Sequence, residues 1–157
     1  MQIISQQTIA STGKKLLLAI PETEIDFAKY YRVRFDVLRK PWHQPKGSEK
    51  DAGDNTSHHV CLLNGDDVIG VCRLQINSAD EAQIRYMAVS ENYRRQKLGD
   101  VMLLYFENLA KQMEIKTIIL QAREIAVGFY KHNGYEITEK TFLLFGEIQH
   151  YLMRKEV

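Results

Sequence analysis

The apolar positions at the start of the chain follow the spacing first of a strand and then of a helix. Residues 15–20 (KLLLAI) form a short apolar run that stops at Pro21, which predicts a buried strand. Apolar residues recur at helical spacing over residues 22–38, and Pro41 ends the pattern, so we expect a helix there. Its apolar positions are Ala28, Tyr31, Phe35 and Leu38. Residues 1–13 show no clear pattern, and an added edge strand is one interpretation of them.

The middle of the chain is patterned as an antiparallel meander. The runs HHVCLL and VIGVCRLQI flank the turn NGDD and predict a hairpin, and AQIRYMAV adds a third strand after the turn NSADE. Before this meander, residues 39–57 hold two of the three prolines and the only tryptophan, with little periodicity. We interpret them as a long loop, a kind of segment that often carries function.

The second half of the chain alternates helices and strands. An amphipathic helix is predicted by the spacing of Leu98, Val101, Met102, Tyr105, Leu109 and Met113. The strand KTIILQA follows, then a short helix over 125–132 that Asn133 and Gly134 end, and then two strands over 135–142 and 147–154. A strand that leads through a helix into another strand predicts a right-handed crossover with parallel neighbours. The fold class is therefore α/β, with a mixed, mostly antiparallel central sheet and flanking helices.

Composition limits the class of protein. The 157 residues are 45% apolar and 26% charged, and the net charge is +1. A chain of this length buries roughly 68 to 70% of its unfolded surface, enough for one core. The near-neutral charge argues against a dedicated nucleic-acid or membrane-surface binder. The longest apolar run is far shorter than the roughly 18 residues of a membrane span, and the start lacks the regions of a signal peptide, so we expect a cytoplasmic protein.

The two cysteines are predicted to be reduced and buried. Cys61 and Cys72 lie in strand-like runs, and a hairpin turn at Asn64 and Gly65 would pair Cys61 near Val68 or Gly70 instead of Cys72. His58, His59 and Cys61 resemble the start of a zinc site, but no second pair stands at ligand spacing. We therefore expect no metal.

The segment from Val89 to Asp100 (VSENYRRQKLGD) carries the clearest chemistry. It lies between a predicted strand and the amino end of a helix, where backbone NH groups and the helix dipole favour a phosphate. Arg94, Arg95 and Lys97 add positive charge, and Gly99 permits close approach of the backbone. A solvated basic helix start is the alternative. The phosphate-loop patterns GxxxxGK[ST] and GxGxxG are absent.

This segment resembles the signature of the GNAT superfamily of acyl-CoA-dependent N-acetyltransferases. That signature has Arg or Gln, Gly three residues later and Gly or Ala two after that, behind a strand ending in valine. The matching residues are Val89, Tyr93, Arg94, Leu98 and Gly99. Glu91 stands where proline is usual, and Lys97 replaces the first glycine. If Lys97 has ordinary helical dihedral angles, it still offers its NH, and its ammonium group can pair with a phosphate. The alternative is that the lysine clashes with the pyrophosphate.

A second stretch supports the resemblance independently. In ILQAREIAVGFYKHNGYEI, five residues match the superfamily's spacing of alanine, then Phe-Tyr, then Gly-Phe: Ala126, Phe129, Tyr130, Gly134 and Tyr135. Arg123 stands where many relatives carry asparagine. Read without the resemblance, these residues also suit the core and cap of a short helix. The resemblance covers about residues 15–155 and implies a single N-acetyltransferase domain over 1–157.

The resemblance implies acetyl-CoA or another acyl-CoA as acyl donor, held where the strand ending at Val89 splays from the strand 116–121. Backbone groups of residues 87–89 would pair with pantetheine, and NH groups of residues 95–100 would hold the pyrophosphate. The implied binding residues are Met87, Ala88, Val89, Arg94, Arg95, Gln96, Lys97, Leu98, Gly99, Asp100, Arg123, Ala126, Phe129 and Tyr130.

The implied reaction is direct attack of a primary amine, of a small molecule or a protein, on the thioester. Tyr130 is the expected general acid toward the CoA sulfur, and the NH of Val89 the expected oxyanion donor. The general base stays open, with Glu81, His58 or His59 acting through water as candidates.

The acceptor side is assigned to the long loop. Glu49, Asp51 and Asp54 would attract a cationic amine and Trp42 would form a wall, or the loop is simply acidic and solvated. The apolar residues 141–147 cover the cleft or pack in a homodimer, the slightly preferred interpretation.

One alternative function is a catalytically inactive GNAT-fold module that binds or senses acyl-CoA, since Lys97 replaces the glycine and no base is evident. Nucleic-acid binding through Arg94, Arg95 and Lys97 is disfavoured, because the cluster is small and has no interleaved aromatic run.

Overall fold

A computed structural model describes all residues of the chain, 1–157. Its strands and α-helices follow one another in the order β1 (Gln2–Thr8), β2 (Lys15–Ile20), α1 (Glu24–Leu38), β3 (His58–Asn64), β4 (Asp67–Ile76), β5 (Glu81–Val89), α2 (Leu98–Gln112), β6 (Thr117–Arg123), α3 (Val127–His132), β7 (Glu136–Leu144) and β8 (Ile148–Glu156). Short 3-10 turns lie between them: η1 (Lys40–Trp42), η2 (Ala52–Thr56), η3 (Glu91–Tyr93) and η4 (Glu124–Ala126). No helix is both long and apolar enough to cross a membrane.

The eight strands form one sheet in the order β1-β2-β3-β4-β5-β6-β8-β7. Strands β5 and β6 are parallel, as the predicted crossover requires, whereas β1 with β2, β2 with β3, β6 with β8 and β7 with β8 are antiparallel. The predicted α/β class with a mixed, mostly antiparallel sheet is therefore confirmed. The unassigned start of the chain forms the edge strand β1.

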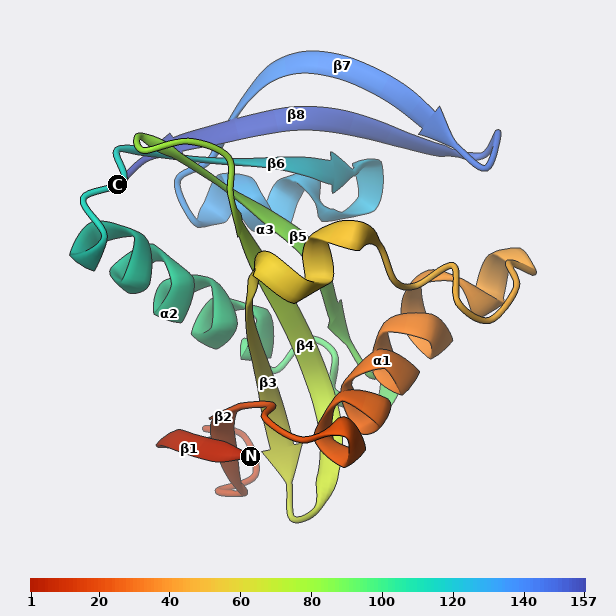
Figure 1. Ribbon diagram of the computed structural model, residues 1–157, viewed down its shortest axis with the longest axis vertical. Helices are drawn as coiled ribbons and strands as arrows, with labels where there is room; N and C mark the ends of the chain where they lie inside the picture. The colour runs from red at the N-terminus through yellow and green to blue at the C-terminus, as the bar shows by residue number, and fades with distance from the viewer. The chain divides into compact units, whose positions relative to one another are not determined.

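The chain divides into two compact units, of which the first comprises residues 1–73 and 86–104. In this unit α1 packs on β3 and β4 (Figure 1). The shared core contains Tyr30, Val33 and Leu38 of α1 and Leu63, Val68 and Val71 of the strands. Both cysteines are buried and free, as predicted.

The second unit comprises residues 74–85 and 105–157. Strand β8 lies between β6 and β7 and pairs with both along most of its length (Figure 1). The buried residues of β6 alternate, with Ile118, Leu120 and Ala122 inside, as expected for a strand with one covered face. The short helix α3 follows β6 and ends before Gly134, whose φ of 86° is the left-handed cap predicted from the sequence.

Helix α1 forms where it was predicted, but only part of its predicted apolar set is buried: Leu38 is buried and Tyr31 and Phe35 are half-buried. Thr23 caps the helix by accepting a hydrogen bond from the backbone NH of Asp26 at 3.2 Å. Ala28 is exposed, and the fully or nearly buried side chains are Tyr30, Val33, Arg34 and Leu38. The pattern missed Arg34 because a hydrophobic pattern counts an arginine as polar, although this one occupies a core position.

Candidate functional site

Strand β5 changes direction near its end. The parallel ladder between β5 and β6 runs from Glu81 paired with Thr117 to Ile84 paired with Leu120, although both strands continue beyond it. Two residues after Ile84, Tyr86 has a φ of 52°, a conformation that is an outlier for a bulky side chain. The predicted binding residues Met87, Ala88 and Val89 follow directly, so they lie on the part of β5 beyond the ladder.

The loop after β5 is anchored to two turns of the first unit. The NH of Ser90 donates to the carbonyl of Ile69 at 2.8 Å. The hydroxyl of Tyr93 accepts a hydrogen bond from Asn64 Nδ2 at 2.6 Å, and the ammonium group of Lys14 lies 5.6 Å from the centre of the Tyr93 ring. These contacts hold the segment between β5 and α2 against the β3–β4 and β1–β2 turns.

Arg95 and Lys97 both adopt left-handed backbone conformations, with φ of 60° and 59°. Of the two alternatives left open for Lys97, the one with ordinary helical dihedral angles therefore does not apply. The lysine takes the conformation that a glycine adopts without cost, directly before α2 begins at Leu98. Arg94, Arg95 and Lys97 expose their side chains, so three cations surround the amino end of a 15-residue helix. Such an arrangement favours an anion.

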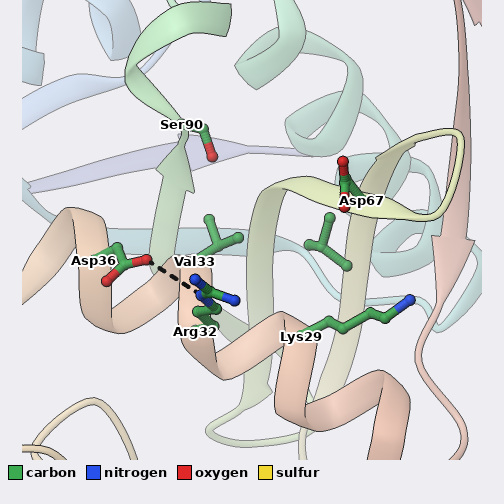
Figure 2. Close-up of a pocket in the computed structure, with 7 residues that line it drawn as sticks. Lys29, Arg32, Val33, Asp36, Asp67 and Ser90 are labelled. Carbon is green, nitrogen blue, oxygen red and sulfur yellow. Dashed lines mark ion pairs between the residues drawn. The ribbon is translucent and has the colours of Figure 1, made fainter.

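A cleft of about 370 Å³ lies near the start of this loop (Figure 2). Lys29, Arg32 and Asp36 of α1, Asp67 of β4 and Ser90 contribute to its lining. Its charges balance, because the lining holds the cations Lys29 and Arg32 and the carboxylates Asp36 and Asp67, and Arg32 Nε lies 3.8 Å from Asp36 Oδ2. The cleft therefore favours neither a cation nor an anion.

The remaining predicted residues belong to the second unit. Arg123 ends β6, where it pairs with His150 of β8, and Ala126 ends η4. Tyr130 is buried in α3, and its ring packs edge-on against Phe129, with centroids 5.0 Å apart, and against Tyr135 at 5.8 Å. The structure thus collects the predicted site residues into two groups, Met87–Asp100 in the first unit and Arg123–Tyr130 in the second.

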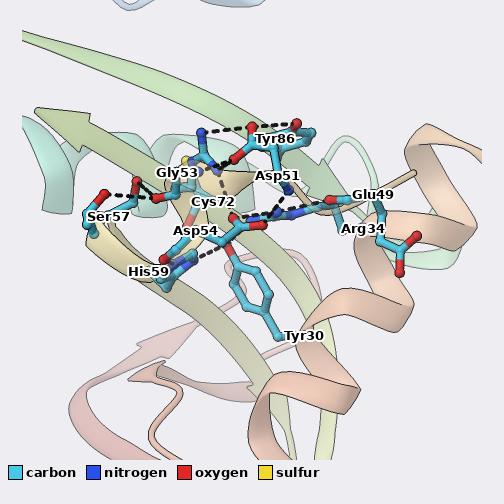
Figure 3. A network of polar contacts seen from close by, with 12 residues as sticks. Tyr30, Arg34, Glu49, Asp51, Gly53, Asp54, Ser57, His59, Cys72 and Tyr86 are labelled. Carbon is cyan, nitrogen blue, oxygen red and sulfur yellow. Dashed lines mark hydrogen bonds and ion pairs between the residues drawn. The ribbon is translucent and has the colours of Figure 1, made fainter. Parts of the chain in front are cut away.

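Asp51 and Asp54 of the long loop point into the protein, toward two arginines (Figure 3). Asp54 Oδ1 accepts hydrogen bonds from Nη1 of Arg34 and from Nη1 of Arg73, each at 2.8 Å. Asp51 accepts from Arg73 through both carboxylate oxygens, at 2.5 and 3.2 Å. The buried Glu49 carboxylate accepts from the NH of Gly47 at 2.7 Å. The alternative of a solvated acidic loop is therefore wrong for these carboxylates.

Pairing keeps both aspartates ionised. Burial opposes ionisation of Asp51, but hydrogen bonds from Arg73 and Tyr86 outweigh it and lower the pKa to about 2. Burial also opposes ionisation of Asp54. Hydrogen bonds from Arg34, the Asp51 backbone and Arg73 outweigh it and lower the pKa of Asp54. Sequence reasoning missed Arg34 and Arg73. A signal existed, because each interrupts an apolar run while acidic residues gather in a nearby loop.

Two candidates for the general base are already engaged within the fold. The ring of His59 is buried, with Nε2 2.8 Å from the carbonyl of Asp54 and Nδ1 3.2 Å from the hydroxyl of Tyr30. Burial lowers the pKa of His59, which favours the neutral ring. Glu81 accepts a hydrogen bond from Asn77 Nδ2 at 2.9 Å. His58 is exposed at the start of β3.

Comparison with known proteins gives consistent similarities. Residues 24–135 match the acetyltransferase (GNAT) family. A Bacillus subtilis (strain 168) protein called "Uncharacterized N-acetyltransferase YjcF" is 29% identical over 143 residues, covering 90% of this chain and 99% of that protein. The crystal structure of an acyl-CoA N-acyltransferase from Pseudomonas aeruginosa is similar with a TM-score of 0.77 and 18% identity, covering 96% of this chain and 99% of that chain. The structure of a GNAT family acetyltransferase from Elizabethkingia anophelis with acetyl-CoA bound gives a TM-score of 0.69 at 17% identity, covering 90% and 98%.

The left-handed backbone of Lys97 generates a prediction about stability. A residue with a Cβ pays roughly 1–2 kcal/mol for this conformation, whereas glycine does not. Glycine also gains freedom in the unfolded chain, which offsets part of this saving. We therefore expect Lys97→Gly to raise the free energy of unfolding by a net amount of about 1 kcal/mol, measured in urea. Lys97→Ala is the control, since it removes the ammonium group but keeps the Cβ and should give no such gain. Destabilisation by Lys97→Gly would contradict the backbone assignment.

The ionised Asp51 generates a prediction about pH. Its pKa of about 2 in the folded protein lies below the ordinary value of 3.8, so its stabilisation is present above that ordinary value and is lost as pH falls toward 2. Asp51→Asn should lower the free energy of unfolding by about 2 kcal/mol at pH 6, and the difference from wild type should shrink between pH 5 and pH 2. Urea unfolding across this range measures it. Asp36→Asn, which removes an exposed ion pair, should cost less than about 0.5 kcal/mol, and a pH-independent effect of Asp51→Asn would refute the pairing.

Proposed function

The chain belongs to the acetyltransferase (GNAT) family, and we propose that it transfers an acetyl group from acetyl-CoA to a primary amine of a small molecule or a protein. The observation that carries this proposal is the segment from Tyr86 to Gly99. It combines the end of β5, beyond the ladder with β6, with a left-handed, cationic loop at the start of α2. Similar proteins whose structures hold acetyl-CoA or coenzyme A support the choice of donor.

In this proposal residues of the first unit hold the pantetheine arm and the pyrophosphate of acyl-CoA. Backbone groups of Met87, Ala88 and Val89 pair with the pantetheine amides as an added strand would. NH groups of the residues from Arg95 to Asp100 bind the pyrophosphate. The residues fit this ligand, because the exposed cations Arg94, Arg95 and Lys97 match its phosphate charges, and the left-handed Lys97 supplies the backbone geometry of the signature glycine.

The proposed chemistry is a direct displacement at the thioester carbon. The neutral amine forms the new carbon–nitrogen bond and releases its surplus proton to solvent water, from which the Tyr130 phenolate regains the proton that it donates. The carbon–sulfur bond breaks with its electron pair leaving on sulfur. The NH of Val89 donates to the carbonyl oxygen as negative charge develops there. The phenol of Tyr130 donates a proton to the departing thiolate. Arg123, Ala126 and Phe129 are assigned to the walls of the cofactor site.

Titration of the purified protein with acetyl-CoA tests the proposal. We expect saturable binding by calorimetry and release of CoA when a panel of primary amines is added. No binding at millimolar acetyl-CoA would refute the proposed donor. Binding without CoA release from any amine in a broad panel would instead favour a module that only senses acyl-CoA.

Tyr130→Phe should separate chemistry from binding. Because the variant keeps the ring but loses the proton donor, we expect kcat to fall by roughly 100-fold or more while the Kd for acetyl-CoA stays within about twofold. Tyr135→Phe is the control, since Tyr135 is buried against the Tyr130 ring and is assigned no catalytic role. Unchanged turnover in Tyr130→Phe would remove its role as general acid.

A further inference from the structure

Tyr86 adopts a backbone conformation that it does not favour. Its φ of 52° places a large aromatic residue in the left-handed region, where contact between Cβ and the backbone makes the conformation costly. Such a conformation persists only where the surrounding structure imposes it, and it is found preferentially at functional sites. Contacts with its surroundings must therefore hold Tyr86 in this conformation.

The side chain of Tyr86 is held at both its hydroxyl and its ring. The hydroxyl donates a hydrogen bond to Asp51 Oδ2 at 2.9 Å. The guanidinium carbons of Arg34, Arg73 and Arg39 lie 4.2, 5.0 and 5.5 Å from the centre of the ring. Cation–π contacts of this kind are strongest where water is excluded, and the side chains of Arg34 and Arg73 have no exposed surface.

The two buried arginines are themselves fixed by the long loop. Asp54 joins them, because one of its oxygens accepts from both guanidinium groups, and Asp51 binds Arg73 through two oxygens. The loop presents both aspartates because they cap the turn η2. Asp51 accepts from the NH of Gly53 at 2.9 Å, and Asp54 accepts from the NH of Asp51 at 2.9 Å. Figure 3 shows Asp51, Asp54, Arg34 and Tyr86 converging in this cluster.

We propose that Tyr86, Asp51 and Arg73 are positioning residues, which hold the left-handed turn of β5 and so direct the backbone of Met87–Val89 toward the pantetheine arm of acyl-CoA. This inference rests on the proposed function. Tyr86 is the residue directly before that backbone segment, so a change in its φ redirects the amide groups that follow it. The nucleotide end of the ligand is assigned to another part of the chain, residues 95–100, whereas the hydrogen bonds described for the cluster join Tyr86, Asp51 and Arg73.

The test uses two ligands and the purified wild-type protein. Acetyl-CoA carries the pantetheine arm, and 3′-phospho-ADP is the nucleotide half of the same molecule without it. Tyr86→Phe keeps the ring among the guanidinium groups but removes the hydrogen bond to Asp51. We expect the Kd for acetyl-CoA to rise about 5- to 10-fold, because the variant loses about one hydrogen bond that holds Tyr86 in position. The Kd for 3′-phospho-ADP should stay within about twofold.

Tyr31→Phe is the matched control. The ring of Tyr31 also lies 5.0 Å from the Arg34 guanidinium carbon, but its hydroxyl does not bond to Asp51, so both Kd values should stay at the wild-type level. Asp51→Asn provides a second variant, and it should reproduce the selective loss of acetyl-CoA binding at a temperature well below its midpoint of unfolding.

Equal weakening of both ligands in Tyr86→Phe, or no weakening of either, would overturn the positioning role, because a general loss of stability does not distinguish the two halves of the ligand. Wild-type protein that binds 3′-phospho-ADP and acetyl-CoA equally well would also overturn it. Failure of the wild type to bind acetyl-CoA at all would refute the proposed function, a result distinct from the others.

Discussion

The pairing of two buried arginines with two aspartates is the interaction on which the first unit depends. Arg34 on α1 and Arg73 on β4 have no exposed side-chain surface. Removing a cation from water costs several kcal/mol unless close, well-oriented partners replace the lost hydration. Asp54 meets both arginines, and Asp51 meets Arg73. These contacts tie the long loop to α1 through Arg34 and to β4 through Arg73.

The second constraint is the backbone itself. Tyr86, Arg95 and Lys97 are left-handed; Tyr86 directly precedes the segment from Met87 to Asp100 that the proposal assigns to acyl-CoA, and Arg95 and Lys97 lie within it. The position at which the family signature has glycine thus holds a lysine in the conformation that glycine adopts without cost. Contacts of the Tyr86 side chain, such as its hydrogen bond to Asp51, oppose the cost of this conformation at Tyr86.

Much of the fold was predictable because it is written in local spacing. The strands, the helices and the parallel crossover follow from apolar periodicity and turn residues, and each formed close to its expected bounds. The differences have one physical origin. The apolar pattern counts Arg34 as polar, and one interpretation of the long loop leaves its aspartates solvated, whereas here opposite charges neutralise one another inside the protein.

The sequence by itself determined the order of elements, the free cysteines and the resemblance to the acetyltransferase family, since these depend on residue types at short, fixed separations. Only the tertiary structure decided that Arg34 is a core residue, that His59 is locked between Tyr30 and Asp54, and that Lys97 is left-handed. The reason is that these features depend on partners from separate elements and on the exclusion of water, which periodicity along one chain segment does not record.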